Sequence, residues 1–101
     1  MLPSARIYDI VSQIPKGKVA TYKDVAKKAQ INNPRLVGLI LHRNTDQENI
    51  PCHRVVRSDG TIASGYAFGG PAKQEEKLRN EGVQFLPNGR INVSKSLYQL
   101  T

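Results

Sequence analysis

The residues with the clearest capacity for chemistry are adjacent: Cys52 and His53, within PCHRVV at 51–56. A thiolate is a strong nucleophile, and a neighbouring imidazole can act as the base that forms it. Cys52 is the chain's single cysteine, so an internal disulfide is excluded. With only two histidines beside it, a structural zinc site of four nitrogen or sulfur ligands is not expected. Two readings of Cys52 remain, a buried inert thiol and a nucleophile.

The charge balance indicates an anionic partner. The chain of 101 residues carries 15 Lys and Arg against 8 Asp and Glu, a formal net charge of +7. A protein this basic commonly binds nucleic acid, although a solvated basic surface would give the same count. With four Tyr, two Phe and no Trp, an extended platform that stacks single-stranded bases is not favoured.

Length and hydropathy predict a single domain over residues 1–101. A hydrophobic fraction of 39% suffices for one modest core and argues against disorder. The sequence contains no long apolar run and no stretch typical of a signal peptide. We therefore expect a monomer without membrane contact, located in the cytoplasm and, in a bacterium, associated with the nucleoid.

Three helices are predicted in the first half of the chain. Apolar residues at helical spacing indicate a helix over 3–14, which Pro15 and Gly17 end. Thr21 begins a capping-box pattern for a helix over 21–29. Asn33 as N-cap and Pro34 at the first helical position predict a third helix over 32–44. The last two helices, joined by a tight turn, form a helix-turn-helix pattern.

The second half is predicted to be less regular. We expect a short strand over 53–56, a turn with the Asp-Gly signal over 58–61 and a glycine-rich loop over 63–70. A charged helix over 71–80 and a final strand over 90–98 follow. The predicted fold class is thus mainly α with a small β-hairpin, a winged-helix-like helix-turn-helix domain that binds DNA.

Several motifs together resemble one known family. PCHRVV at 51–56 resembles the active-site signature of the O6-alkylguanine-DNA alkyltransferases, which transfer an alkyl group from damaged guanine to their own cysteine. GKVATYKDVAKKA at 17–29 and NPRLVG at 33–38 are similar to the family's first motif helix and recognition helix. GYAFGG at 65–70 resembles its substrate-pocket loop, and EG at 81–82 its closing glutamate. The motifs occur in the family's order along nearly the whole chain.

The resemblance implies a set of site residues. Cys52 would accept the alkyl group, His53 would take the thiol proton through a water, and Glu81 would orient His53. Asn44, eight residues before Cys52, would tether the hinge of the active-site loop. Tyr66 would donate a hydrogen bond to the guanine, within a substrate pocket formed by Val55, Gly65, Tyr66 and Ala67. No cofactor and no metal are implied.

The resemblance also implies how DNA is bound. The alkyl carbon is out of reach inside a duplex, so the base must be flipped out. Tyr22 would rotate the phosphate of the damaged nucleotide, and Arg35 would fill the gap left by the base. The other residues implied in DNA binding are Thr21, Lys23 and Arg54. The expected partner is double-stranded DNA that contains O6-alkylguanine.

The sequence also departs from this family pattern. Asn44 is followed by Thr45 where proline is usual, Ala67 replaces a common serine, and the chain starts at the catalytic domain. The tail KLRNEGVQFLPNGRINVSKSLY is similar to that of alkyltransferase-like proteins, which bind alkylated DNA and flag it for nucleotide excision repair. Alkyl transfer is the first hypothesis because Cys52 is retained. A lesion sensor that recruits nucleotide excision repair proteins is the second, and a helix-turn-helix regulator is the third.

Overall fold

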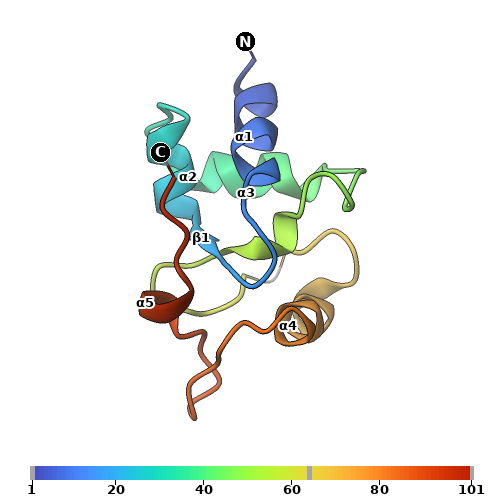
Figure 1. Cartoon of the computed structure of the whole chain (residues 1–101). Coiled ribbons are helices and arrows are strands. Elements are labelled where there is room, and N and C mark those ends of the chain that lie inside the picture. The colour runs from blue at the N-terminus through green and yellow to red at the C-terminus, as the bar shows by residue number, and fades with distance from the viewer. Residues whose placement is uncertain (1, 64, 101) are drawn as a thin grey trace.

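A computed structural model describes residues 2–63 and 65–100. Helices dominate this part of the chain, with α1 to α3 at one end of the molecule and α4 and α5 at the other (Figure 1). Two short strands and a 3-10 helix lie between the two ends. The elements are, in order, α1 (Pro3–Ser12), β1 (Ala20–Thr21), α2 (Tyr22–Lys28), α3 (Pro34–His42), η1 (Cys52–Arg54), β2 (Val55–Val56), α4 (Gly70–Asn80) and α5 (Val93–Ser96).

The capping residues define the two helices of the helix-turn-helix pattern. Thr21 Oγ1 accepts a hydrogen bond from the Asp24 N–H at 3.0 Å, which satisfies a free amide in the first turn of α2. Asn33 Oδ1 accepts from the Arg35 N–H at 3.0 Å, and Pro34 occupies the first turn of α3. Both caps confirm the predicted helix starts. The two helices pack against each other and against α1.

The strands pair differently from the prediction. β1 and β2 are parallel, with Ala20 opposite Val55 and Thr21 opposite Val56, so the predicted β-hairpin is wrong. The strand expected over 53–56 is shortened because residues 52–54 form η1. The Asp-Gly turn does form, with the Gly60 N–H donating to Arg57 O at 2.9 Å. The chain beyond this turn enters the pocket loop and adds no strand to the pair.

The C-terminal strand predicted over 90–98 is also wrong. Asn92 Oδ1 accepts from the Lys95 N–H and caps the short helix α5, so the middle of this segment is helical. Isolated bridges remain on either side, antiparallel between Phe85 and Ile91 and parallel between Val19 and Leu97. The helix predicted over 71–80 is confirmed as α4.

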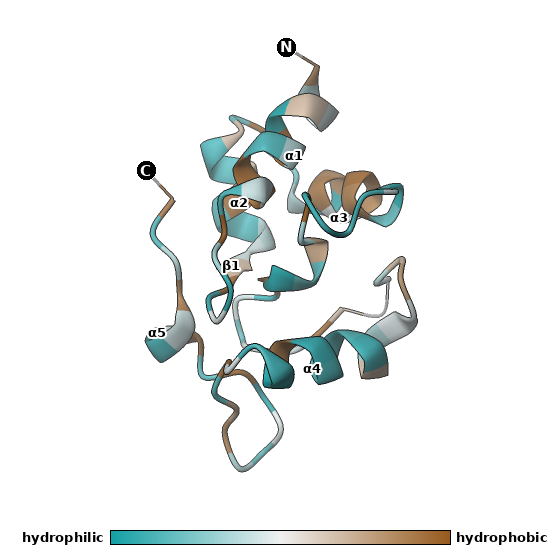
Figure 2. Ribbon diagram, turned by 45° about the vertical axis from the view of Figure 1, so that its right-hand side comes forward, coloured by the Kyte–Doolittle hydropathy of each residue, from teal (hydrophilic) through white to brown (hydrophobic). Residues whose placement is uncertain are grey.

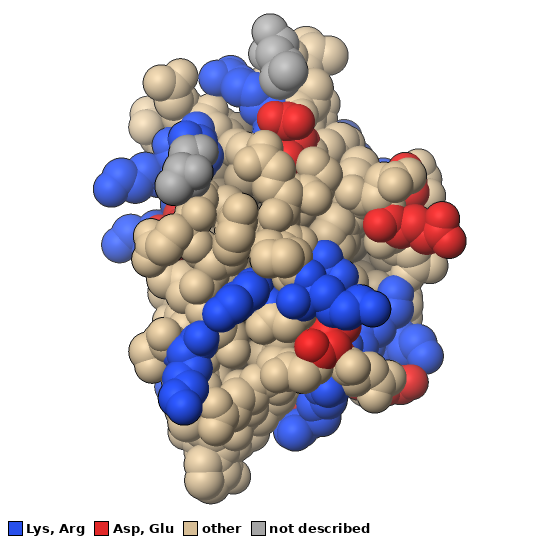
Figure 3. Space-filling view, viewed as in Figure 1, with Lys and Arg blue, Asp and Glu red and all other residues tan. Residues whose placement is uncertain are grey.

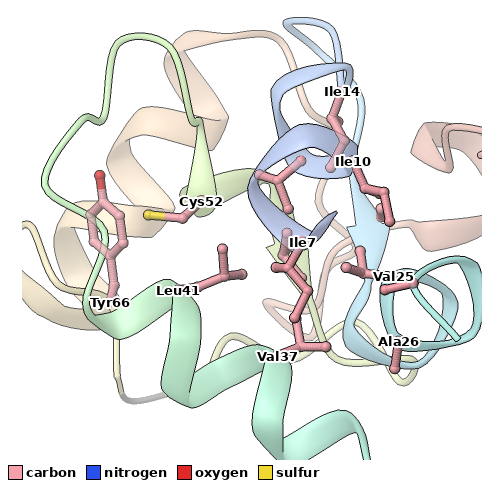
Figure 4. Close-up of a cluster of buried hydrophobic side chains, with 13 residues drawn as sticks. Ile7, Ile10, Ile14, Val25, Ala26, Val37, Leu41, Cys52 and Tyr66 are labelled. Atoms are coloured by element: carbon pink, nitrogen blue, oxygen red, sulfur yellow. The ribbon is translucent and has the colours of Figure 1, made fainter. Parts of the chain in front are cut away.

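Two hydrophobic clusters stabilise the fold. The larger one joins α1, α2 and α3 to the Cys52 segment, and Figure 4 shows its side chains between these elements. The smaller one packs Val19, Val56, Leu78, Val83 and Ile91 together. In Figure 2, apolar residues are prominent on α3 whereas α4 is mainly hydrophilic, because α4 turns most of its surface to solvent. None of the helices within residues 2–63 and 65–100 has the length and apolar character that a membrane span requires.

Candidate functional site

The backbone before Cys52 is held in a tight turn. Pro51 has φ −77° and ψ 70°, the geometry of an inverse γ-turn, and the Cys52 N–H donates to Ile50 O at 2.8 Å. The Asn44 side chain supports this turn: its Nδ2 donates to Ile50 O at 2.8 Å and its Oδ1 accepts from the Asp46 N–H at 2.9 Å. Asn44 is itself buried. These contacts fix where η1 begins and therefore where the sulfur lies.

His53, Arg54 and Glu81 form one charged network behind the cysteine. His53 Nε2 lies 3.0 Å from Glu81 Oε2. Arg54 donates to both carboxylate oxygens of Glu81, from Nε at 3.0 Å and from Nη2 at 2.8 Å. Its Nη1 donates to Ile14 O at 2.7 Å. The network links the residues just after α1 and α4 to the active-site segment. Arg54, predicted to bind DNA, thus has internal partners.

Burial shapes the pKa values in this network. Burial raises the pKa of the Cys52 thiol, and the nearby Asn44 side chain opposes this only in part. Burial lowers the pKa of His53 despite the hydrogen bond to Glu81. Burial would raise the pKa of Glu81, but hydrogen bonds from Arg54 and His53 outweigh it and hold that pKa below its usual value. The free protein at neutral pH therefore holds a thiol, a neutral imidazole and a carboxylate.

The tautomer of His53 follows from these charges. An ionised Glu81 only accepts hydrogen bonds, so Nε2 of the neutral ring carries the hydrogen. Nδ1 is then the unprotonated, basic nitrogen. This atom is buried and has no hydrogen-bond partner among the described residues. His53 is therefore prepared to accept a proton.

A pocket of about 290 Å³ opens in front of Cys52. In Figure 4 the Cys52 sulfur points toward the Tyr66 ring, beside Leu41 of α3. The Tyr66 hydroxyl is buried and has no hydrogen-bond partner among the described residues. The pocket is lined by Tyr22, Pro34, Arg35, Gly38, Leu41, His42, Cys52, Arg57, Ala63, Gly65, Tyr66, Ala67 and Gln74. Its wall therefore combines apolar surface with a thiol, and Tyr66 adds a buried hydroxyl without a partner among the described residues.

The structure brings together most of the residues that the sequence singled out. Tyr22 and Arg35, from the first turns of α2 and α3, line the same pocket as Cys52 and Tyr66, and Gly65 and Ala67 complete this set. Asn44, His53, Val55 and Glu81 lie behind the pocket wall rather than on it. The Thr21 hydroxyl is occupied as the cap of α2, while Lys23 is exposed.

Sequence reasoning missed three polar residues of the pocket wall. The buried Gln74 donates from Nε2 to His53 O at 2.9 Å and to Val55 O at 3.2 Å, so it anchors the active-site segment to α4. His42 Nδ1 lies 2.8 Å from Gly65 O, and Arg57 follows β2. The helical spacing of Gln74 and the apolar Leu78, four residues apart, could have shown that Gln74 faces inward.

Basic side chains are spread over the surface around α2. Figure 3 shows Lys and Arg at the edge of the molecule near α2 and in a band across the middle of the same face. On α2, Lys23, Lys27 and Lys28 are exposed. Within residues 2–63 and 65–100, His, Cys, Asp and Glu form no group of three that could hold a metal ion. The chemistry available at this site is that of a thiol beside a basic surface.

Comparison with known proteins places this fold in a DNA-binding class. Residues 3–83 match the model of the 6-O-methylguanine DNA methyltransferase, DNA binding domain. The chain belongs to this family. The predicted resemblance and the mainly helical fold class are thereby confirmed.

Individual relatives carry two kinds of name. The chain is 46% identical over 78 residues to the methylated-DNA–protein-cysteine methyltransferase of Methanothermobacter thermautotrophicus, covering 77% of this chain and 43% of that protein. It is 39% identical over 95 residues to the DNA base-flipping protein of Escherichia coli, covering 89% and 69%. Against the bifunctional methyltransferase/endonuclease of Picrophilus torridus it spans 29% of that protein's length. The chain thus spans less than half of these two methyltransferase relatives.

Solved structures show the same division. The Schizosaccharomyces pombe Atl1 structure in complex with damaged DNA containing O6-carboxymethylguanine has a TM-score of 0.81 at 29% identity, covering 96% of this chain and 94% of that one. The O6-methylguanine-DNA methyltransferase of Pyrococcus kodakaraensis has a TM-score of 0.69 at 36% identity, covering 79% and 46%. The family therefore includes proteins named for transfer and proteins named for base flipping.

Proposed function

We propose that this chain repairs O6-alkylguanine in double-stranded DNA by moving the alkyl group to Cys52. The observation that carries the proposal is the position of Cys52 in the wall of a pocket that Tyr66 also lines, and the buried Tyr66 hydroxyl has no hydrogen-bond partner among the described residues. Family membership supports a damaged guanine as the occupant.

The step is a displacement at the saturated alkyl carbon. The thiol proton moves to His53 Nδ1, the Cys52 sulfur forms a bond to the alkyl carbon, and the carbon–O6 bond breaks with its electron pair going to guanine. Tyr66 donates its hydroxyl proton to the departing guanine, and the proton held by His53 replaces it. The net change exchanges a thiol hydrogen for an alkyl group. Since a thioether is stable and the chain has no second cysteine, each molecule reacts once.

His53 and Glu81 serve the proton transfer in this scheme. A neutral imidazole is the required form of a base, and the burial that lowers the pKa of His53 maintains that form at neutral pH. Glu81 fixes the ring through Nε2 and stabilises the positive charge that develops on it. Burial also raises the pKa of Cys52, so deprotonation occurs during the reaction rather than before it.

The first turns of α2 and α3 carry residues that we propose contact DNA. Arg35 and Tyr22 lie at the first turns of their helices and at the pocket, where they would contact the duplex and the flipped nucleotide. A pocket of about 290 Å³ is suited to one base with its substituent. Exposed lysines on α2 would neutralise phosphates along the duplex.

Intact-mass measurement tests the proposal. The protein is incubated with excess duplex carrying O6-methylguanine, and we expect its mass to rise by one methylene unit as the methyl group replaces the thiol hydrogen. The matched controls are a duplex with unmodified guanine and the variant Cys52→Ser, neither of which gains mass. An unchanged mass after prolonged incubation would contradict alkyl transfer, as would transfer that survives Cys52→Ser.

A lesion sensor is the second candidate. The likeness to Atl1 over 94% of that chain supports it, and so does a thiol whose pKa is raised by burial. This alternative predicts preferential binding of the O6-methylguanine duplex without a change in mass. Binding would depend on Arg35 in both cases, so the mass measurement separates the two candidates.

A further inference from the structure

Arg57 is a pocket residue to which the proposed mechanism assigns no task. It directly follows β2 and lines the same pocket as Cys52. Its backbone is held from both sides: its N–H donates to Thr61 O at 3.1 Å, and its carbonyl accepts from the Gly60 N–H at 2.9 Å. The side chain is exposed, but its starting point is fixed. Arg57 therefore contributes to the pocket wall from a backbone that two hydrogen bonds hold in place.

The pocket is lined by two arginines that form no ion pair with any of the described residues. Arg35 and Arg57 line it, and no Asp or Glu is among its lining residues. The ion pairs within residues 2–63 and 65–100 involve neither guanidinium. Asp59, the carboxylate nearest to Arg57 in sequence, has its pKa lowered first by hydrogen bonds from Thr61 and also by the charge of Arg57, but its Oδ1 is hydrogen-bonded to Thr61 and forms no ion pair with Arg57. A ligand carboxylate could therefore pair with Arg57.

The rest of the pocket makes such a pairing selective. Much of its wall is apolar, from side chains such as Leu41 and Ala63. A negative charge that enters apolar surroundings is unfavourable unless it meets a fixed donor of opposite charge. A guanidinium binds carboxylates through two parallel hydrogen bonds and matches their geometry. Arg57 would thus favour an anionic substituent over a neutral one of equal size.

We propose that Arg57 determines specificity for O6 adducts that end in a carboxylate, such as O6-carboxymethylguanine. This inference rests on the proposed function, because it requires the flipped O6-alkylguanine to occupy this pocket. Atl1, which shares the fold, was crystallised with DNA that contains this adduct. In the present chain the carboxylate would extend from O6 past Cys52 and meet the Arg57 guanidinium.

The test compares an anionic adduct with a neutral one of the same shape. Affinities are measured in a Cys52→Ser background, which cannot transfer the group, for duplexes with guanine, O6-carboxymethylguanine and O6-carbamoylmethylguanine. The informative quantity is the ratio of affinities for the carboxylate and amide adducts. We expect Arg57→Ala to lower this ratio about tenfold, the effect of losing a charge-assisted hydrogen bond worth about 1.4 kcal/mol.

Lys23→Ala is the matched control, since Lys23 is exposed on α2 and is expected to contact phosphate. It should weaken all three duplexes alike and leave the ratio unchanged. An unchanged ratio in Arg57→Ala would overturn the inference, and an equal loss for all duplexes would make Arg57 a phosphate contact. If the Cys52→Ser protein with Arg57 intact binds neither adduct better than guanine, the proposed function fails instead. Thermal unfolding of each variant verifies that it is folded.

Discussion

Glu81 is the residue whose loss should most clearly expose the importance of the network behind Cys52. Its carboxylate accepts from Arg54 at 3.0 and 2.8 Å and lies 3.0 Å from His53 Nε2. The side chains of His53, Arg54 and Glu81 are only 5%, 14% and 13% exposed, so Glu81→Ala leaves a nearly buried guanidinium without its anion. Removing one partner of a buried pair costs about 3–5 kcal/mol. We expect the lower end, about 3 kcal/mol, because Arg54 keeps its bond to Ile14 O.

Urea unfolding of the wild type and of Glu81→Ala measures this difference, with equal slopes required for the comparison. A loss of about 3 kcal/mol corresponds to a fall in melting temperature of roughly 12–24 °C for a domain of this size. Glu75→Ala is the control, because Glu75 pairs with Arg79 at 3.2 Å on the same helix but both side chains are about half exposed. Its loss should cost about 0.3–0.5 kcal/mol. Equal losses in the two variants would refute the network argument.

The pH dependence provides an independent check of the same reasoning. The folded-state pKa of Glu81 is lowered, so its stabilising contribution is complete above the unfolded pKa of about 4.3 and is lost as the pH falls through the lower folded value. The difference between wild type and Glu81→Ala should therefore be large at neutral pH and shrink below about pH 4. The folded-state pKa of His53 is also lowered, so its protonation destabilises the wild type as the pH falls below about 6.5. A difference that stays constant down to about pH 3 would show that Glu81 does not act through its charge.

Two further predictions concern the thiol and a turn. The positive charge of Lys77 lowers the pKa of Cys52, so Lys77→Met should raise that pKa further. The pH dependence of iodoacetamide labelling measures the change in pKa. An unchanged labelling profile would argue against the effect. Gly60→Ala should destabilise the protein by more than about 2 kcal/mol, since its φ is +85° and an added Cβ would lie 2.5 Å from Ile91 O. Gly89→Ala, with φ +86° and no atom within 4 Å of the added Cβ, should cost only the backbone strain of about 1–2 kcal/mol. Equal losses in the two glycine variants would remove the steric explanation.

The helices were predictable from the sequence because their ends are determined locally. Thr21 and Asn33 satisfy backbone amides within their own first turns, so a short window of sequence contains the signal. The strands were not predictable in the same way. β1 and β2 are two residues long and pair across more than thirty intervening residues, and nothing near Val55 specifies a parallel partner. The residues next to Asn92 favour a strand, but the Asn92 side chain caps a helical turn, and the segment forms α5.

Site residues that belong to a sequence motif could be predicted, whereas residues that only tertiary contacts bring together could not. Cys52 and His53 are adjacent in sequence. Family resemblance added Tyr22, Arg35 and Tyr66, which line the pocket in the structure. The bidentate contact of Arg54 with Glu81 could not be predicted, since 26 positions separate the two residues in the sequence. Gln74 belongs to no motif, and only the folded chain brings it to Cys52, whereas Arg57 directly follows PCHRVV and was passed over because it lies outside the motif.

The parallel pair β1–β2 has a consequence for how this molecule opens. Ala20 and Val55 belong to the larger hydrophobic cluster, whereas the next positions outward, Val19 and Val56, belong to the smaller one. The same few backbone amides thus border both apolar interiors. Opening one hydrophobic cluster would expose the other cluster to water. We therefore expect hydrogen exchange at these central amides to require unfolding of the whole chain. The region that carries Cys52 would then be the last to lose protection, and under the proposed function a bound duplex would contact a rigid surface.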